Sequence, residues 1–130
     1  MDCKFLAMEC TDTMIKLTLP YPPSVNTYWR YHNKGVHLNP KGRAYRTLVT
    51  AHCYDQLGLT EPLRKRLKVT IDAYPPDARL RDLDNIQKPL LDALEFAQVF
   101  LNDAQIDHLT TQRKSIAPPK GQLIVTLEEV

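Results

Sequence analysis

Two aspartates, Asp82 and Asp84, stand two residues apart in the segment RLRDLDNIQK, among Arg79, Arg81 and Lys88. In an extended chain, side chains two residues apart point to the same side, so both carboxylates could face one ligand. Mg²⁺ takes hard oxygen ligands and needs only one or two carboxylates when a substrate phosphate completes its shell. The basic neighbours would bring a phosphodiester close. The segment therefore predicts metal-assisted phosphodiester cleavage, in which a bound ion makes water a better nucleophile.

Asp103 is the third candidate ligand, nineteen residues after Asp84 and beyond a predicted helix. Fourteen helical residues are about 21 Å long. Residues 98–103 span about 17 Å when extended, so the chain could bring Asp103 most of the way back. By itself Asp103 also suits a turn. The alternatives that the spacing leaves open are Asp72, Asp92 and Asp107.

The same residues also have a purely structural interpretation. Asp84 suits the N-cap of a helix, and Asp82 lies just upstream, where the helix dipole favours negative charge. Lys88 stands four residues after Asp84 and four before Asp92, the spacing of exposed ion pairs. Spacing alone leaves both interpretations open, because a bare Asp-x-Asp pair carries little information.

The charges are unevenly distributed along the chain. From Thr13 to Tyr54 there is no Asp or Glu, but there are six Lys and Arg and six of the ten aromatic residues. From Asp55 onward, ten basic residues face twelve acids. A basic, aromatic half beside a carboxylate-bearing half predicts a nucleic-acid surface next to a metal site. The predicted DNA-binding residues are Arg30, Lys34, Lys41, Arg43, Arg46, Arg79 and Arg81.

Hydrophobic periodicity predicts the elements that position these residues. Alternation predicts strands over residues 15–19, 67–73 and 123–127. A strand of mixed polarity is expected over 106–116, and residues 24–39 suit a short hairpin or ordered loop. A helix is expected over 41–57, with Asn39 as N-cap and Gly58 as its end. A second helix is expected over 84–99. The expected apolar positions are Ala44, Leu48, Ala51 and Tyr54 or Asp55 in the first helix, and Ile86, Leu90, Leu91, Leu94, Ala97 and Gln98 in the second.

This order predicts a single α+β domain over residues 14–130, with a mixed β-sheet and two main helices packed against it. We expect residues 1–13 to be a loosely ordered leader. Composition excludes other classes. No apolar run approaches the roughly 20 residues of a membrane span, and no glycine-rich loop indicates a small-molecule cofactor. The three cysteines are odd in number and form no CxxC pair, which argues against disulfides or zinc, and Cys53 is expected to be a reduced core residue.

Three blocks resemble the RusA family of Holliday-junction resolvases, in the family's order. They are LPYPPSVN, followed by Tyr28 and Arg30, then RDLDNIQK, and finally LNDAQI. The resemblance covers roughly residues 15–128. It implies that Asp82, Asp84 and Asp103 are metal-binding catalytic acids and that Lys88 is needed for activity. Asn102 stands where some members have a further aspartate, and Pro89 is unusual directly after the second block.

The resemblance implies a magnesium-dependent, homodimeric endonuclease that resolves four-way junctions by symmetric nicking, in DNA recombination and repair. A bacterial or phage-encoded protein of the cytoplasm is expected, since the N-terminus does not read as a signal peptide. The alternative is a non-catalytic nucleic-acid-binding regulator of the same fold, whose acids serve only as caps and ion pairs. A third hypothesis is a magnesium-dependent hydrolase of small nucleotides, which would not need the extended basic surface.

Overall fold

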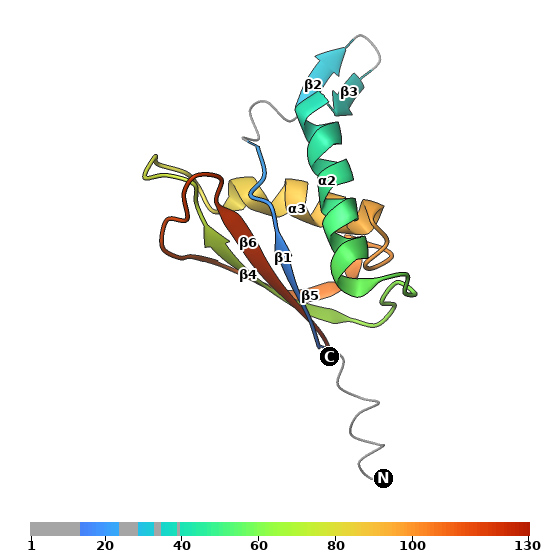
Figure 1. Cartoon of the computed structure of the whole chain (residues 1–130). Helices are drawn as coiled ribbons and strands as arrows, with labels where there is room; N and C mark the ends of the chain where they lie inside the picture. The colour runs from blue at the N-terminus through green and yellow to red at the C-terminus, as the bar shows by residue number, and fades with distance from the viewer. Residues whose placement is uncertain (1–13, 24–28, 33–34, 39) are drawn as a thin grey trace, which may run out of the picture.

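The computed structural model describes residues 14–23, 29–32, 35–38 and 40–130. The predicted leader, Lys34 and the predicted N-cap Asn39 therefore lie outside the described residues. Four strands form one sheet: β1 (Met14–Leu19), β4 (Leu67–Tyr74), β5 (Ile106–Arg113) and β6 (Gln122–Glu129). Their order is β1-β6-β4-β5, with β4 and β5 parallel and the other pairs antiparallel (Figure 1). The prediction of a mixed sheet is confirmed.

The alternating strands direct their apolar residues to one face of the sheet. In β4, Leu67, Val69, Ile71 and Ala73 are buried, and Lys68 between them is exposed. β6 contributes Leu123, Val125 and Leu127 to the same core. Two helices cover this face, α2 (Pro40–Leu57) and α3 (Asp84–Phe96), as Figure 1 shows. The predicted α+β domain with two main helices is therefore confirmed.

Helix α2 buries a different face from the predicted one. Ala44, Leu48, Ala51, Tyr54 and Asp55 are all exposed. The apolar side chains of this helix are spread around its axis, so periodicity alone does not select a face. One specific contact orients it, because the buried Tyr45 donates a hydrogen bond from its hydroxyl to the carbonyl of Pro20, at 2.9 Å. The buried residues are Gly42, Tyr45, Val49 and Cys53, so the core position of Cys53 is confirmed.

Helix α2 ends where predicted, because Gly58 has the positive φ of 74° that favours glycine at a helix C-terminus. Helix α3 is shorter than predicted. It ends at Phe96, with Ala97 as its C-cap, and Gln98 has a φ of 62°. Ala97 is half-buried and packs against the core, as expected, but Gln98 is exposed, so the expectation that it lies on the core face was wrong. The other four predicted core residues of α3 are buried.

The remaining elements connect these layers. A hairpin of β2 (Trp29–His32) and β3 (Gly35–Leu38) adjoins the N-terminal end of α2, in the region where a hairpin or loop was predicted. Helix α3 and the short 3₁₀ helix η2 (Asp103–Gln105) form the crossover that parallel strands β4 and β5 require. Among the described residues, no helix combines the length and apolar character needed to cross a bilayer.

Candidate active site

A well-anchored loop carries the Asp-x-Asp segment from β4 to α3. Asp77 Oδ1 accepts hydrogen bonds from the backbone N–H of Arg79, at 3.0 Å, and from Arg81 Nη1, at 2.8 Å. Arg81 Nη1 also donates to the carbonyl of Asp77, at 3.1 Å. From β5, Arg113 donates to the carbonyl of Arg81. The bond from Arg81 holds the pKa of the Asp77 carboxyl at about 2, so this network persists at neutral pH.

Asp82 and Asp84 lie at the N-terminal end of α3, and both are exposed. Leu83 is the N-cap of the helix and makes no side-chain cap bond, so the alternative in which Asp84 caps the helix was wrong. Among the described residues, no side chain forms an ion pair or hydrogen bond with either carboxylate. Both carboxylates therefore remain available to a ligand, at the end of the helix whose dipole is positive.

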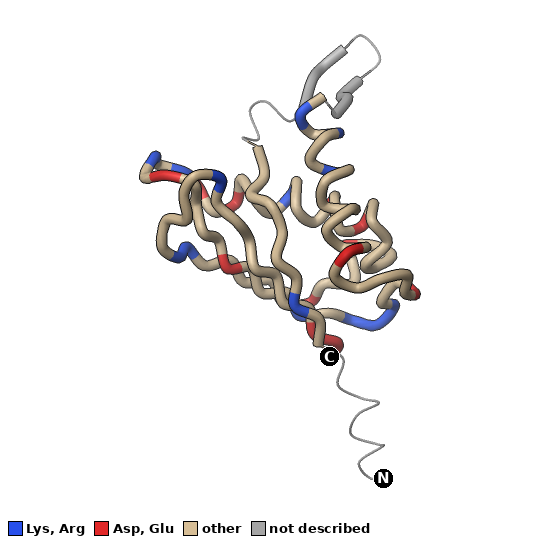
Figure 2. Tube along the Cα trace, viewed as in Figure 1, with Lys and Arg blue, Asp and Glu red and all other residues tan. Residues whose placement is uncertain are grey.

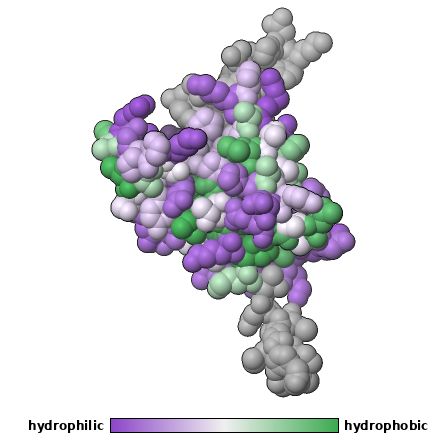
Figure 3. Space-filling view, in the orientation of Figure 1, coloured by the Kyte–Doolittle hydropathy of each residue, from purple (hydrophilic) through white to green (hydrophobic). Residues whose placement is uncertain are grey.

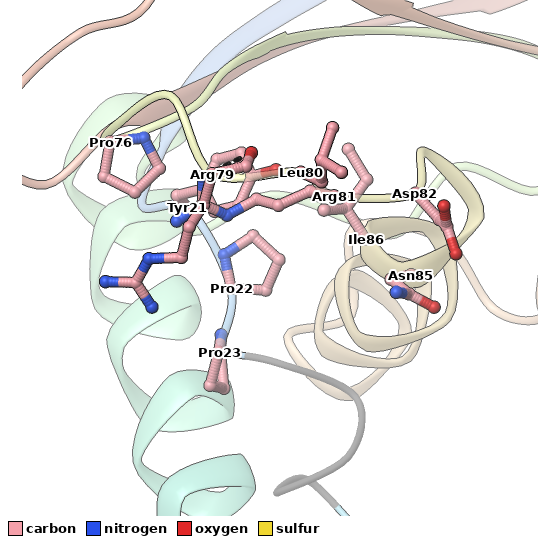
Figure 4. A pocket seen from close by; sticks show the side chains of 10 residues that line it. All are labelled: Tyr21, Pro22, Pro23, Pro76, Arg79, Leu80, Arg81, Asp82, Asn85 and Ile86. Atoms are coloured by element: carbon pink, nitrogen blue, oxygen red, sulfur yellow. Dashed lines mark hydrogen bonds between the residues drawn. The ribbon is translucent and has the colours of Figure 1, made fainter.

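A cavity of about 420 Å³ opens beside Asp82. Tyr21, Pro22 and Pro23 line one side, facing Asp82 and Asn85 across the cavity in Figure 4. The Arg81 guanidinium lies 5.8 Å from the centre of the Tyr21 ring. Burial raises the pKa of Tyr21 more than Arg81 and Arg113 lower it. The cavity thus combines an apolar wall, two arginines and one of the candidate metal-binding acids.

Lys88 lies on the exposed side of the first turns of α3. Its Nζ is 3.3 Å from Asp92 Oδ2, an ion pair between residues four apart in the helix. The lysine side chain is 64% exposed, so this pair is not buried and can open at little cost. The predicted pairing with Asp92 is confirmed, and it leaves the lysine within about one helical turn of Asp84.

Asp103 lies at the other end of α3. Its backbone N–H donates to Glu95 Oε1, at 3.1 Å, and Glu95 belongs to the last turn of the helix. Eleven helical steps separate Asp84 from Glu95, or about 16 Å along the axis. Among the described residues, no three His, Cys, Asp or Glu side chains gather closely enough to hold a metal ion. One chain therefore does not bring Asp103 to Asp82 and Asp84.

The other acids that the sequence left open are accounted for differently. Asp92 pairs with Lys88. Asp107 accepts hydrogen bonds from Arg66, which lower the pKa of its carboxyl. Asp72 lies on β4, where its Oδ1 is buried and has no hydrogen-bond partner among the described residues. None of the three joins Asp82 and Asp84 in a cluster of three within the described part of the chain.

Sequence reasoning missed the residue that shapes the Asp103 turn, which is Gln105. Its Oε1 accepts from the backbone N–H groups of Leu101 and Asn102, each at 2.9 Å. Its Nε2 donates to the carbonyls of Leu63 and Lys65, at 3.0 and 2.9 Å. The Asn102 side chain accepts from the Ala104 N–H, at 2.8 Å, and it forms a reciprocal capping box with Gln105. The spacing of Asn102 and Gln105, three residues apart, was the available signal for this turn.

The predicted DNA-binding residues fall into two groups. Lys41, Arg43 and Arg46 lie on the N-terminal half of α2, where Figure 2 shows Lys and Arg without Asp or Glu. Arg79 and Arg81 lie on the β4–α3 loop. The Arg46 guanidinium lies 4.1 Å from the centre of the Phe96 ring, so this residue also joins α2 to α3. Arg30 belongs to β2, and its side chain, like Lys34, lies outside the described residues.

Comparison with known proteins tests the family resemblance. The model of the family Endodeoxyribonuclease RusA matches residues 20–128. Several relatives carry the name crossover junction endodeoxyribonuclease RusA. The one from Enterobacteria phage HK97 is 39% identical over 88% of this chain and 94% of its own length. Those from Shigella sonnei and Escherichia coli K12 are 37% and 36% identical, over 88% of this chain and 93% of their own lengths. The chain belongs to the RusA family of endodeoxyribonucleases.

Proposed function

We propose that this protein is a structure-selective, magnesium-dependent endodeoxyribonuclease that resolves Holliday junctions by symmetric nicking, in DNA recombination and repair. Relatives named as crossover junction endonucleases, which come from phages and bacteria, support this function and a place in the bacterial cytoplasm. The observation that carries the proposal is the pair of exposed carboxylates, Asp82 and Asp84, beside Arg79 and Arg81 at the start of α3.

The donors at this site fit Mg²⁺. Asp82 and Asp84 offer hard oxygen ligands that are exposed, and no cation among the described residues is paired with them. One or two carboxylates suffice for Mg²⁺ when water and a substrate phosphate complete the coordination. When bound, the ion would lower the pKa of a coordinated water and stabilise the charge that grows on the phosphate.

The surrounding side chains would bind and orient the DNA. Arg79 and Arg81 pair with Asp77 and line the same cavity as Asp82, and they would hold the phosphodiester against repulsion from the acids. Lys88 would leave its exposed pair with Asp92 and stabilise the negative charge of the reacting phosphate. Lys41, Arg43 and Arg46 on α2, with Arg30 and Lys34, would bind the arms of the junction.

We infer that Asp103 completes the site of a second chain in a homodimer. Asp103 lies about 16 Å along α3 from Asp84 in its own chain, so it reaches an Asp82–Asp84 pair only if that pair belongs to another copy. A two-fold dimer would exchange this residue reciprocally and form two equal sites. Two related sites also suit a substrate that is cut by two symmetric nicks.

The test is cleavage of a synthetic four-way junction, with and without Mg²⁺, beside a linear duplex of the same sequence. We expect nicks in two opposing strands of the junction only when Mg²⁺ is present. Asp82→Asn and Asp84→Asn should each abolish nicking and retain binding, because each removes a ligand and a negative charge near phosphates. Binding without cleavage by the parent protein would instead favour the non-catalytic regulator. Hydrolysis of free nucleotides alone would favour the third hypothesis.

A further inference from the structure

The most exposed large hydrophobic residue among those described is Leu80, at 99% of its full accessible area. It lies in the β4–α3 loop, which projects from the body of the domain in Figure 1. Exposed leucines are common on protein surfaces. This one differs in its position, two residues before Asp82 and between Arg79 and Arg81.

The loop on either side of Leu80 is anchored. Asp77 accepts from the Arg79 N–H, and the Arg81 side chain returns to Asp77. Arg113 on β5 donates to the carbonyl of Arg81. These hydrogen bonds fix the backbone on both sides of Leu80. The leucine side chain is therefore exposed on an anchored loop. A fixed apolar tip is suited to insertion into a partner.

The neighbouring groups identify the chemistry of that partner. Arg79 is 80% exposed at its side chain, and its charge would meet a phosphate as Leu80 enters apolar surroundings. Figure 3 shows hydrophilic and hydrophobic atoms side by side at this projecting loop. A nucleic acid offers this combination, since its anionic backbone encloses stacked bases, and DNA-binding proteins insert leucine between base steps. The cavity of about 420 Å³ that Leu80 borders leaves room for a displaced base (Figure 4).

We propose that Leu80 inserts between bases at the branch point of the junction and unstacks them, which delivers the adjoining phosphate to Asp82 and Asp84. The proposal rests on the proposed function, because it takes junction DNA as the occupant. It assigns Leu80 a positioning role: the residue contacts the substrate and takes no part in proton transfer or metal binding.

The test compares Leu80→Ala with Leu59→Ala. Leu59 is 87% exposed, lies after α2 and is remote from the Asp-x-Asp segment, so it controls for the loss of an exposed leucine. The junction carries 2-aminopurine at the branch point, and fluorescence is read in EDTA so that the DNA stays intact. The parent and Leu59→Ala should raise the fluorescence by several fold. Leu80→Ala should lose most of this rise and bind with nearly unchanged affinity, and Leu80→Met should restore it.

A second measurement separates unstacking from general damage. In single-turnover nicking with Mg²⁺, Leu80→Ala should be slower by about tenfold or more, because the side chain that holds the base step open is lost. A junction with unpaired bases at its branch point needs no opening, so on it Leu80→Ala should cut nearly as fast as the parent. The parent and Leu59→Ala should cut both junctions alike.

Several results would overturn the inference. Leu80→Ala that matches Leu59→Ala in fluorescence would remove Leu80 from the DNA contact and leave the proposed endonuclease function standing. Slow cutting that unpaired bases do not rescue would show a defect other than unstacking. A changed oligomeric state of Leu80→Ala in light scattering would assign the residue to a protein contact. If the parent neither bound nor cut junctions, the proposed function itself would fail.

Discussion

The side-chain carboxylate of Glu95 accepts a hydrogen bond from the backbone N–H of Asp103, with 3.1 Å between Glu95 Oε1 and the nitrogen. Glu95 lies in the last turn of α3, and Asp84 is the first residue of that helix. The bond therefore ties Asp103 to the end of the helix that is remote from the Asp-x-Asp pair. Within one chain the helix keeps these acids apart, and in the site that we propose a second chain supplies Asp103.

The first prediction is that two inactive variants restore each other. Asp82→Asn and Asp103→Asn should each abolish nicking. If the site is shared, a heterodimer of the two contains one site with both changes and one site with neither. Chains mixed, unfolded together and refolded should then regain nicking of one strand per junction. Strand-specific end labels measure this on a denaturing gel.

The matched control is a mixture of Asp82→Asn with Asp84→Asn. Both changes fall on the same half of the site, so every site in that heterodimer keeps one defect and the mixture should stay inactive. If Asp103 acted within its own chain, the first mixture would also remain inactive. That result would show that Asp103 either acts in the site of its own chain or belongs to no active site.

The second prediction concerns Lys88, for which the ion pair and the catalytic role have different consequences. Loss of an exposed pair at this helical spacing costs about 0.3–0.5 kcal/mol of stability. Loss of a charge directed at the reacting phosphate costs about a hundredfold or more in rate. Lys88→Ala should show both effects, in chemical denaturation and in single-turnover nicking.

Asp92→Asn is the control for Lys88, because it breaks the same pair and keeps the lysine. This variant should lose a similar amount of stability and cut at least as fast as the parent. A Lys88→Ala protein that cut within a few-fold of Asp92→Asn would place Lys88 on the helix surface as an ion-pair residue only.

The third prediction concerns the basic face of α2. Binding should weaken steeply with salt, because each neutralised phosphate releases counterions. Lys41→Gln with Arg43→Gln should lower the slope of log K against log salt by about 0.9 for each phosphate that is no longer neutralised. Filter binding or anisotropy over a range of KCl concentrations measures the slope. Lys16→Gln with Lys68→Gln removes the same charge from exposed positions of β1 and β4 and should leave the slope unchanged. An unchanged slope for the α2 pair would show that the DNA surface does not include α2.

Arg46 needs its own measurement, since it lies over the Phe96 ring between the helices. An exposed cation–π contact is worth about 0.5–1 kcal/mol. Arg46→Gln should therefore lower both the salt slope and the free energy of unfolding, whereas Lys41→Gln by itself should lower the salt slope.

The fourth prediction is a pH dependence from Asp77. The pKa of its carboxyl is about 2 in the folded protein, below its ordinary value, because Arg81 donates a hydrogen bond to it. A group with a lowered folded pKa stabilises the fold above its unfolded pKa and loses that contribution as pH falls through the folded value. The parent should be more stable than Asp77→Asn between about pH 5 and pH 7, and their difference should shrink between about pH 4 and pH 2, as urea denaturation would show. If the difference in stability between the two proteins stayed constant with pH, ionisation of the Asp77 carboxyl would not be its cause.

Sequence patterns predicted the sheet well because burial of one face imposes a period of two. Val69, Ile71, Val125 and Leu127 alternate with polar residues, and they are all buried. The face of α2 could not be predicted in this way. Its buried row includes Gly42 and Cys53, and its exposed residues include Leu48, so hydrophobicity gives little contrast around the helix.

The position of Asp103 could not be predicted from the sequence, for a different reason. The reach of an extended chain allowed residues 98–103 to return toward Asp84. In the fold, however, Phe100 is fully buried and bridges to Leu63, and the Val99 N–H bonds to the carbonyl of Leu94. These interactions hold the segment at the C-terminal end of α3. Chain length gives only the greatest distance that residues 98–103 could span. Burial of Val99 and Phe100 keeps the actual path of this segment much shorter.

The length of α3 would also determine the geometry of the product. In the proposed dimer, each chain gives Asp82 and Asp84 to one metal site and Asp103 to the other. Because these acids lie at opposite ends of α3, the two metal sites would lie about one helix length apart. The length of the helix would then fix the distance between the two phosphodiesters that are cut. Inserting one residue into it would rotate one end by about 100° relative to the other and change both centres together. The crossover would therefore tolerate substitutions on its exposed face far better than changes in its length.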